Sequence, residues 1–354
     1  MKSKLRVGLV CGGCSLEHEV SLKSAIYIMK YINKRFFEVV VLWISKQGDW
    51  YIVENDDMHI DFFVNKENLH KCMPILMFSS GNRCFEYINN ILSLDVIFPI
   101  IHGALGEDGS LQGLLRLMNL PYVGSDVLGS AICMDKDITK RLLRDSGLSI
   151  TPFRTFLAHE KKKLKFLNFA DMFGLPFFVK PVNQGSSIGV AKVNDDYSFH
   201  SALDIAFFYS HKIIIESCIA GRELECAVLG NNENPITSVC GEIIKKNDDF
   251  YTYCDKYVDH NSEIVIPAVL EKSVSSKIRS IAIRVFQILN CFGMARVDIF
   301  LFGKDRIIIN EVNTLPGFTS DSMYLKLWQA TGINISTLLT RLIMLALDRY
   351  YKYN

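Results

Sequence analysis

Two carboxylates and an amide near the C-terminus have the spacing of a metal site on adjacent strands. Apolar and polar residues alternate over residues 295–300, which places Arg296 and Asp298 on one face of a predicted strand. Glu311 and Asn313 share a face just beyond the next apolar run. Such oxygen ligands suit Mg²⁺, which proteins usually bind together with substrate phosphates. The set predicts metal-assisted nucleotide chemistry; two unrelated strand-end carboxylates are the alternative.

Three further features suit the phosphates of a nucleotide. Lys180 lies in an apolar run at 176–181, where a buried ammonium needs an anion unless it reaches solvent. Lys136 lies in a predicted amphipathic helix at 135–146, and an ordinary surface lysine is the alternative. The glycine-serine loop at 185–189 offers backbone N–H groups and hydroxyls. It lacks the pattern of a Walker A motif, so each feature is ambiguous when it is taken alone.

Two glutamates complete a candidate nucleotide site. Glu216 ends a predicted strand at 213–216, and Glu223 begins another at 223–228. Ionised carboxylates accept hydrogen bonds, so they suit the amino group of adenine and the hydroxyls of ribose. For each glutamate, an exposed carboxylate at a strand end is the alternative.

The elements that position these groups follow from hydrophobic periodicity. The first ~45 residues predict a βαβ unit in which Gly12 and Gly13 separate a strand from a helix capped by Ser21. Backbone N–H groups point outward at such a junction, which makes a site for an anion or a carboxylate. Further strands are predicted at 96–101, 190–193, 295–301 and 306–311, helices up to 119 and at 274–289, 323–331 and 335–351, and a polar, tyrosine-rich loop at 245–261.

The bulk composition predicts a folded α/β (α+β) multidomain protein. Of its 354 residues, 49% are hydrophobic and 22% are charged. We expect three units, at 1–125, 126–212 and 213–354, with a mobile loop at 245–261 in the last. The net charge of +1 predicts neither a nucleic-acid nor a membrane partner, because both usually need a basic excess.

Cysteine usage and hydropathy predict a cytoplasmic enzyme. The ten cysteines include one C-x-x-C, Cys11 and Cys14, but no second pair at the spacing of a metal site. We therefore expect reduced and mostly buried thiols. No uncharged apolar stretch reaches the ~18 residues of a membrane span, and the N-terminus does not resemble a signal peptide.

The order of these features resembles the ATP-grasp superfamily, and within it the D-alanine:D-alanine ligase family. The resemblance covers nearly the full length of the chain. Many long motifs occur in the right order, which excludes chance similarity. It implies an N-terminal parallel-sheet βαβ domain followed by a two-lobed ATP-grasp fold. The matching segments are GGCSLEHEVSLKSA (12–25), HGALGEDGSLQG (102–113), PYVGS (121–125), MDKDITK (134–140), VKPVNQGSSIGV (179–190), FYTYCDKY (250–257), ARVDIF (295–300) and NEVNTLPGFTSDSM (310–323).

The resemblance implies roles in amino-acid binding and catalysis. Glu17 matches the glutamate that holds the amino group of the first D-alanine, a sensible charge-assisted bond. Ser186 matches the hairpin serine that helps to orient Glu17 and a tyrosine of the mobile loop, here Tyr257. Arg296 and the backbone N–H of Gly317 match the groups that stabilise an oxyanion. The remaining substrate contacts implied are His102, Ser322 and Met323.

The resemblance also implies the nucleotide and metal ligands. ATP is the co-substrate, with two Mg²⁺ or Mn²⁺ ions held by Asp298, Glu311 and Asn313. The first substrate's carboxylate attacks the γ-phosphate, and the second substrate's amine attacks the resulting acylphosphate, from which the mobile loop excludes water. The ATP-binding residues implied are Lys136, Lys180, Ser187, Glu216, Ile219, Glu223, Lys256 and Asn310.

The product is expected to be D-alanyl-D-alanine for peptidoglycan synthesis, made by a homodimer. Lys256 and Tyr257 are absent from the family's lactate-forming members, so their presence favours an amine as second substrate. Departures at Thr252, Cys254-Asp255 and Leu325 leave a D-alanine:D-serine ligase as an alternative. Another ATP-grasp ligase has no reason to keep the Glu17 motif, and a non-catalytic nucleotide-binding protein has no reason to keep every metal ligand.

Overall fold

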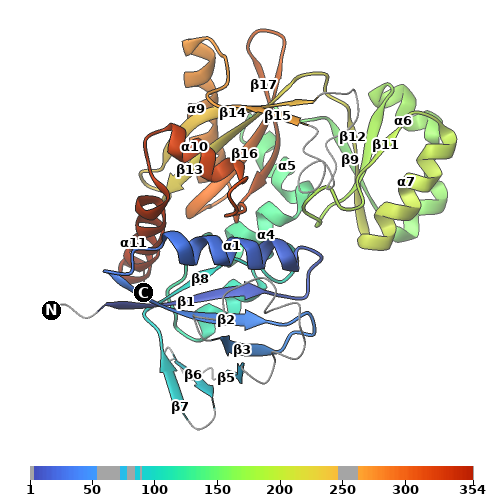
Figure 1. Ribbon diagram of the computed structural model, residues 1–354. Helices are drawn as coiled ribbons and strands as arrows, with labels where there is room; N and C mark the ends of the chain where they lie inside the picture. The colour runs from blue at the N-terminus through green and yellow to red at the C-terminus, as the bar shows by residue number, and fades with distance from the viewer. Residues whose placement is uncertain (1–3, 54–71, 78–83, 88–89, 246–261, 354) are drawn as a thin grey trace.

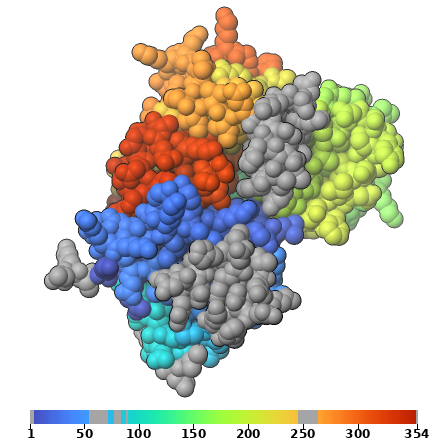
Figure 2. Space-filling model, in the orientation of Figure 1, coloured from blue at the N-terminus to red at the C-terminus, as the bar shows by residue number. Residues whose placement is uncertain are grey.

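The computed structural model describes residues 4–53, 72–77, 84–87, 90–245 and 262–353. The chain forms an N-terminal domain and two further lobes, each built on its own sheet. In Figure 1 the N-terminal domain is blue to cyan, the central lobe is green, and the C-terminal lobe is yellow to red. The space-filling view in Figure 2 shows the central lobe projecting to one side of the other two.

The N-terminal domain is the predicted βαβ unit, extended by further strands. β1 (Leu5–Gly12) pairs in parallel with β2 (Phe37–Ile44) and β8 (Val96–Pro99), and α1 (His18–Tyr31) crosses between them. The central strand is buried on both faces, as its unbroken apolar run predicts. The remaining elements are β3 (Trp50–Val53), β4 (Met73–Pro74), the small sheet of β5 (Leu76–Met77), β6 (Cys84–Tyr87) and β7 (Asn90–Ser93), and α3 (Ser110–Leu117).

The helix cap predicted at Ser21 is wrong. Helix α1 begins at His18, so Ser21 lies inside it. Its hydroxyl accepts a hydrogen bond from the Gly12 N–H at 2.8 Å and donates one to the Ile100 carbonyl at 2.5 Å. Ser21 therefore joins the ends of two parallel strands instead of capping the helix.

The glycine turn after β1 brings two strands close together. Gly12 has φ +90°, and a Cβ there would lie 2.2 Å from the carbonyl oxygen of Ile44. The Gly13 N–H donates to that same oxygen at 2.8 Å. Only glycine adopts this conformation at so close an approach, which explains the predicted turn.

The central lobe is an antiparallel sheet with two helices on one face. Its strand order is β11 (Ala191–Val193), β10 (Phe177–Pro181), β12 (Lys212–Ser217) and β9 (Phe153–Leu157). β10 and β11 form the predicted hairpin around the glycine-serine loop. The two helices are α6 (Phe166–Phe173) and α7 (Asp196–Tyr209), and a 3-10 turn spans Ala158–Lys163. Helices α4 (Val127–Met134) and α5 (Lys136–Asp145) precede this sheet and contribute Cys133 and Leu143 to the core of the C-terminal lobe.

The C-terminal lobe is a larger antiparallel sheet between helices. Its strand order is β15 (Ser262–Val265), β14 (Ile236–Lys245), β13 (Arg222–Gly230), β16 (Gly293–Phe302) and β17 (Arg306–Asn313). The predicted pairing of the last two strands is confirmed. Its helices are α9 (Lys272–Ile288), α10 (Met323–Ala330) and α11 (Ile335–Tyr353).

The division into units at 1–125, 126–212 and 213–354 stays a prediction, and one strand crosses its second boundary. β12 is hydrogen-bonded between β10 and β9, so the chain leaves the central sheet after Ser217 and not at residue 212. We therefore place the end of the central lobe at Ser217. Of the described helices, none by itself is long and apolar enough to cross a membrane, although α10 and α11, bent by 105° at their junction, pass that test as a pair.

The described cysteines are free thiols, as expected. Burial raises the pKa of Cys11 to about 12, while Cys14 is exposed. The two cysteines of the C-x-x-C therefore lie in different environments, one buried and one exposed.

One aromatic side chain joins the first and last parts of the chain. Phe318 is fully buried and packs edge-to-face on Phe98 of β8, with ring centroids 5.8 Å apart. Tyr324 of α10 lies on its other side at 5.9 Å. The N-terminal domain and the C-terminal helices therefore share one hydrophobic core.

We predict that Phe318→Ala lowers the free energy of unfolding by about 3–5 kcal/mol, because it leaves a cavity in this shared core. The matched control is Phe208→Ala, since the Phe208 side chain is 81% exposed. Its effect should stay within about 0.5 kcal/mol. Urea unfolding followed by circular dichroism measures both, and equal effects would contradict the shared core.

Candidate active site

Two adjoining cavities lie where the domain and the lobes meet. One, of about 1050 Å³, lies between the central and C-terminal sheets. The other, of about 590 Å³, lies between α1, the glycine-serine loop and the segment before α10. Both are lined by Lys136, Ser186, Glu225 and Glu311. We call them the nucleotide cavity and the amino-acid cavity, after the ligands that the sequence predicts for them.

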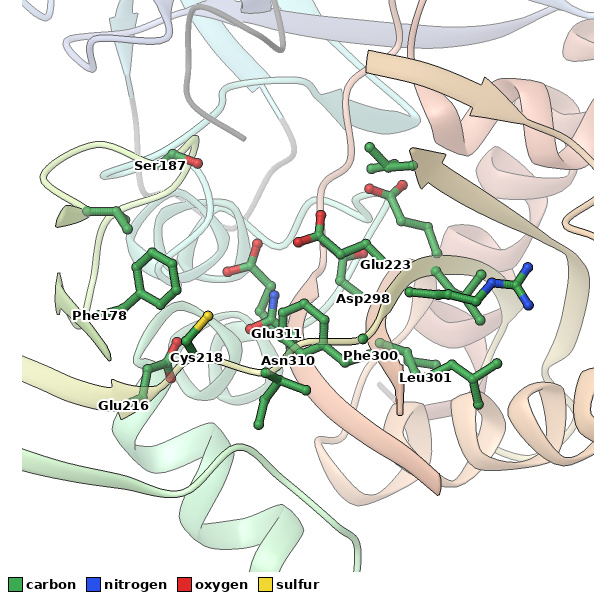
Figure 3. A pocket seen from close by; sticks show the side chains of 18 of the residues that line it. Phe178, Ser187, Glu216, Cys218, Glu223, Asp298, Phe300, Leu301, Asn310 and Glu311 are labelled. Atoms are coloured by element: carbon green, nitrogen blue, oxygen red, sulfur yellow. The ribbon is translucent and has the colours of Figure 1, made fainter. Parts of the chain in front are cut away.

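Every site residue predicted from the sequence that the structure describes lines one of these cavities. Figure 3 shows the nucleotide cavity, with Phe178 and Glu216 on one side, Asp298 and Glu311 in the middle, and Phe300 and Leu301 on the other. Lys256, Tyr257 and the loop at 246–261 lie outside the described residues. The predicted residues lining the nucleotide cavity are Lys136, Lys180, Ser186, Ser187, Glu216, Ile219, Glu223, Asp298, Asn310 and Glu311. Those lining the amino-acid cavity are Glu17, His102, Lys136, Ser186, Arg296, Glu311, Asn313, Gly317, Ser322 and Met323.

The predicted metal ligands meet through strand pairing. In the register of β16 and β17, Asp298 lies opposite Glu311 and Arg296 lies opposite Asn313. Within the described part of the chain, no group of three or more His, Cys, Asp or Glu has metal-site geometry. Two carboxylates and an amide oxygen nevertheless suit a hard cation that takes its remaining ligands from phosphates and water. The donor set therefore fits Mg²⁺ bound together with a nucleotide.

Arg296 is buried between two carboxylates. Its Nε lies 2.7 Å from Asp298 Oδ1 and 3.0 Å from Glu225 Oε2, and a second guanidinium nitrogen lies 2.6 Å from Asp298 Oδ2. Burial lowers the pKa of Arg296, but the two carboxylates outweigh it and raise that pKa well above its ordinary value. Arg296 therefore remains a fixed positive charge at the edge of the amino-acid cavity.

A buried glutamate lies between two lysines on the wall of the nucleotide cavity. Lys180 Nζ donates to Glu216 Oε1, and Lys140 Nζ lies 3.1 Å from Glu216 Oε2. Burial raises the pKa of Glu216, but the two ammoniums outweigh it and lower that pKa to about 2. Burial also lowers the pKa of Lys180, and here Glu216 prevails and raises it. Glu216 is thus an ionised carboxylate that already has two cationic partners.

Lys136 lies where the two cavities join. Its Nζ donates to the carbonyl of Gln184 at 2.7 Å and lies 3.8 Å from Glu311 Oε2. Asp135 caps the helix that carries Lys136, accepting hydrogen bonds from two backbone N–H groups of the first turn. The cap holds the start of α5, and with it Lys136, beside the glycine-serine loop.

Glu17 links the N-terminal domain to the hairpin of the central lobe. The hydroxyl of Ser186 donates to Glu17 Oε1, and the Glu17 side chain is buried. Gly103 and Gly185 allow this approach, because a Cβ at these positions would lie 2.8 Å and 3.3 Å from Glu17 Oε2. Ser186 itself has φ +49°, a conformation that non-glycine residues seldom adopt. The hairpin tip is thus shaped to present its hydroxyl to Glu17.

His102 and Glu107 form a buried pair beside Glu17. His102 Nδ1 lies 3.5 Å from Glu107 Oε1. Burial lowers the pKa of His102, but the Glu107 carboxylate outweighs it and raises that pKa. Burial and the charge of Glu17 together raise the pKa of Glu107. The end of the cavity near α1 therefore contains several interacting ionisable groups.

The opposite end of the amino-acid cavity is formed by the loop before α10. Ser322 Oγ accepts a hydrogen bond from the Thr319 N–H at 2.9 Å. A Cβ at Gly317 would lie 2.9 Å from that same Oγ. The loop thus packs Gly317 closely against Ser322, beside the first residue of α10, Met323.

Three residues of this site were not identified from the sequence. Lys140 lies one helical turn after Lys136, and Glu225 alternates with Glu223 along β13, so spacing alone offered a signal for both. Glu107 lies in a loop, where no periodicity identifies it.

Two family models match nearly the whole chain. The one described as D-ala D-ala ligase N-terminus matches residues 6–125, and the one described as D-ala D-ala ligase C-terminus matches residues 142–344. The chain belongs to the D-alanine:D-alanine ligase family. The D-alanine:D-alanine ligases are ATP-dependent, so the family predicted from the motifs and the ATP co-substrate are confirmed.

Curated members of the D-alanine:D-alanine ligase family are similar over nearly their full length. D-alanine--D-alanine ligase A of Escherichia coli strain K12 is 50% identical over 358 residues, covering 98% of this chain and 97% of that protein. D-alanine--D-alanine ligase of Proteus mirabilis is 46% identical over 361 residues, covering 99% and 97%.

Solved structures of the family have the same fold. The D-alanine-D-alanine ligase from Coxiella burnetii has a TM-score of 0.85 at 35% identity, covering 99% of this chain and 97% of that one. The VanG D-Ala:D-Ser ligase from Enterococcus faecalis has a TM-score of 0.88 at 34% identity, covering 97% and 100%. The predicted fold class, a parallel-sheet domain with a two-lobed ATP-grasp fold, is confirmed.

The depressed pKa of Glu216 predicts a pH-dependent stability. Because the folded-state pKa is about 2 and the ordinary value is 4.5, this carboxylate stabilises the fold above pH 4.5, and the contribution is lost as pH falls towards 2. Wild type and Glu216→Gln, compared by urea unfolding between pH 5 and pH 3, should therefore converge in stability by up to about 1.4 kcal/mol per pH unit. A difference that is constant over this range would contradict the ionised, doubly paired Glu216.

Proposed function

We propose that this ligase joins two molecules of D-alanine through a D-alanyl phosphate, with ATP cleaved to ADP and phosphate, to make D-alanyl-D-alanine for peptidoglycan synthesis. The observation that carries the proposal is the junction of the two cavities. Lys136, Ser186 and Glu311 line both, so a nucleotide and an amino acid in the adjoining cavities meet at these side chains. That is the arrangement that phosphoryl transfer between the two requires.

The first amino acid is proposed to bind beside Glu17. Its ammonium pairs with the Glu17 carboxylate, which Ser186 orients from the hairpin. His102 lines the same end of the cavity and assists in positioning. The substrate carboxylate then attacks the γ-phosphate, and the bond between that phosphorus and the bridging oxygen breaks to release ADP.

The second amino acid is proposed to bind at the opposite end of the cavity, at Ser322 and Met323. Its amine attacks the acyl carbon of the D-alanyl phosphate, and phosphate leaves. Arg296 and the backbone N–H of Gly317 stabilise the tetrahedral oxyanion, an effect worth about 3–4 kcal/mol per donor in comparable sites. The amine loses its proton as the peptide bond forms.

The nucleotide contacts are proposed by carrying the family's pattern onto the lining residues. Lys136 and Lys180 bind phosphates. Ser187, in the loop between β10 and β11, also binds ATP. Glu216 and Ile219 bind adenine, Glu223 binds ribose, and Asn310 contacts the phosphate end of the cavity. Lys256 and Tyr257 belong to the mobile loop, which is proposed to cover the D-alanyl phosphate and exclude water from it.

Asp298, Glu311 and Asn313 are proposed to hold two Mg²⁺ or Mn²⁺ ions. Bound with the nucleotide, such ions neutralise charge on the transferring phosphoryl group. The Asp298 carboxylate accepts two hydrogen bonds from Arg296, so it would bind the metal ion while it is paired with this guanidinium. We further propose a homodimer that acts in the cytoplasm, where ATP is available.

The decisive experiment is phosphate release with ATP, Mg²⁺ and D-alanine as the only amino acid. Release should require D-alanine, and D-alanyl-D-alanine should accumulate in equal amount. D-serine or D-lactate added to a limiting amount of D-alanine tests the second pocket. No release with D-alanine alone would contradict the proposed reaction, and a product that contains mainly D-serine would make this a D-alanine:D-serine ligase.

Metal dependence gives an independent prediction. A chelator should abolish phosphate release, and added Mg²⁺ should restore it. Glu311→Gln should raise the Mg²⁺ concentration for half-maximal rate by at least about tenfold, a loss that even outer-shell partners of a metal cause.

The control for this experiment is Glu223→Gln. Glu223 lines the same cavity but is assigned to ribose, so this variant should raise the KM for ATP and leave the Mg²⁺ requirement unchanged. If both variants shift the Mg²⁺ requirement equally, the metal assignment of Glu311 is wrong.

A further inference from the structure

Lys140 is a buried cation that does not line the nucleotide cavity but contacts residues that do. Only 2% of its surface is exposed, and it is not among the residues that line the nucleotide cavity. Its Nζ lies 3.1 Å from Glu216 Oε2 and donates to the carbonyl oxygen of Asn310 at 3.1 Å. Glu216 and Asn310 both line the cavity, so Lys140 acts on it only through them.

Glu216 cannot be left without a cationic partner. Only 2% of its surface is exposed, so water does not replace a lost partner. Removing one member of a buried ion pair is strongly destabilising, because the remaining charge is uncompensated. Of the two ammoniums that hold Glu216, the one on Lys180 lines the cavity and the one on Lys140 does not.

These two lysines differ in their position and in their partners. Lys180 lies on the cavity wall and is the lysine assigned above to a phosphate. Lys140 is fixed by two partners from different lobes, Glu216 on β12 and Asn310 on β17. It lies on α5, whose first turn is capped by Asp135.

We propose that Lys140 is a positioning residue that serves as the permanent counterion of Glu216 and thereby frees Lys180 to bind a nucleotide phosphate. The inference rests on the proposed function in one respect, the assignment of Lys180 to phosphate. When Lys180 turns towards the phosphate, Glu216 keeps the ammonium of Lys140 and stays ionised and in place. Without Lys140, Lys180 is the sole partner of Glu216 and is retained by it.

The test is a cycle of nucleotide affinities, measured by calorimetry without any amino acid. The probes are AMP-PNP with Mg²⁺, which carries phosphates, and adenosine, which carries none. Lys140→Met should weaken AMP-PNP binding at least about tenfold and change adenosine binding less than about threefold. Equal losses for both probes would mean that Lys140 only shapes the cavity, and would overturn the proposal.

The second arm removes the carboxylate that Lys140 covers. In Glu216→Gln there is no carboxylate to retain Lys180. Adding Lys140→Met to this variant should therefore weaken AMP-PNP binding by less than a further factor of about three. The proposal would be overturned if the loss of AMP-PNP affinity in the double variant equalled the product of the losses in the two single variants. If Lys140→Met alone does not fold, the comparison of the double variant with Glu216→Gln decides by itself.

Two controls complete the design. Lys140→Arg keeps the charge and should retain AMP-PNP affinity within about threefold. Arg141 lies on the same helix, pairs with Asp137 and has a half-exposed side chain. Arg141→Met therefore removes a cation that is not at the nucleotide site, and it should leave AMP-PNP affinity unchanged. Phosphate release by the wild type with D-alanine is assayed separately, so a failure of the proposed ligation is distinguished from a failure of this inference.

Discussion

The pairing of buried charges is the constraint on which the rest of this structure depends. A carboxylate or ammonium without water costs several kcal/mol unless a partner meets it. Glu216 is covered by two ammoniums, and Arg296 lies between two carboxylates. Lys140 meets one partner from each lobe, so its ammonium helps to hold the two lobes together. Two of the paired residues, Lys180 and Glu216, line the nucleotide cavity.

The surrounding fold holds these charges in register. Strand pairing in the C-terminal sheet sets Asp298 opposite Glu311, which no loop would fix as firmly. The N-terminal domain adds Glu17, and the shared core around Phe318 fixes that domain against the C-terminal helices. The hydrogen bond from Ser186 then joins it to the central lobe. The amino-acid cavity therefore lies where residues from the three parts of the chain meet.

Local periodicity predicted much of this arrangement from the sequence, and long-range packing accounts for what it missed. The alternation around Arg296 and Asp298 predicted their common face, because that depends on one strand only. Lys140 was not identified as a site residue, since nothing in the neighbouring sequence records that its side of the helix meets two other elements. The Ser21 cap was wrong for a similar reason, because its hydroxyl bonds to residues that follow a distant strand. Helices α6 and α7 were missed because their exposed faces carry large apolar residues, which blurs the helical period.

The bond between Ser186 and Glu17 makes two binding events interdependent. The hairpin that carries Ser186 borders the nucleotide cavity, while Glu17 borders the cavity for the amino acid. A ligand that moves Ser186 or Glu17 also changes the binding free energy of the ligand in the other cavity. Such linkage is reciprocal, so the factor by which nucleotide alters amino-acid affinity equals the factor by which the amino acid alters nucleotide affinity. Each ligand is therefore an effector of the other to the same degree.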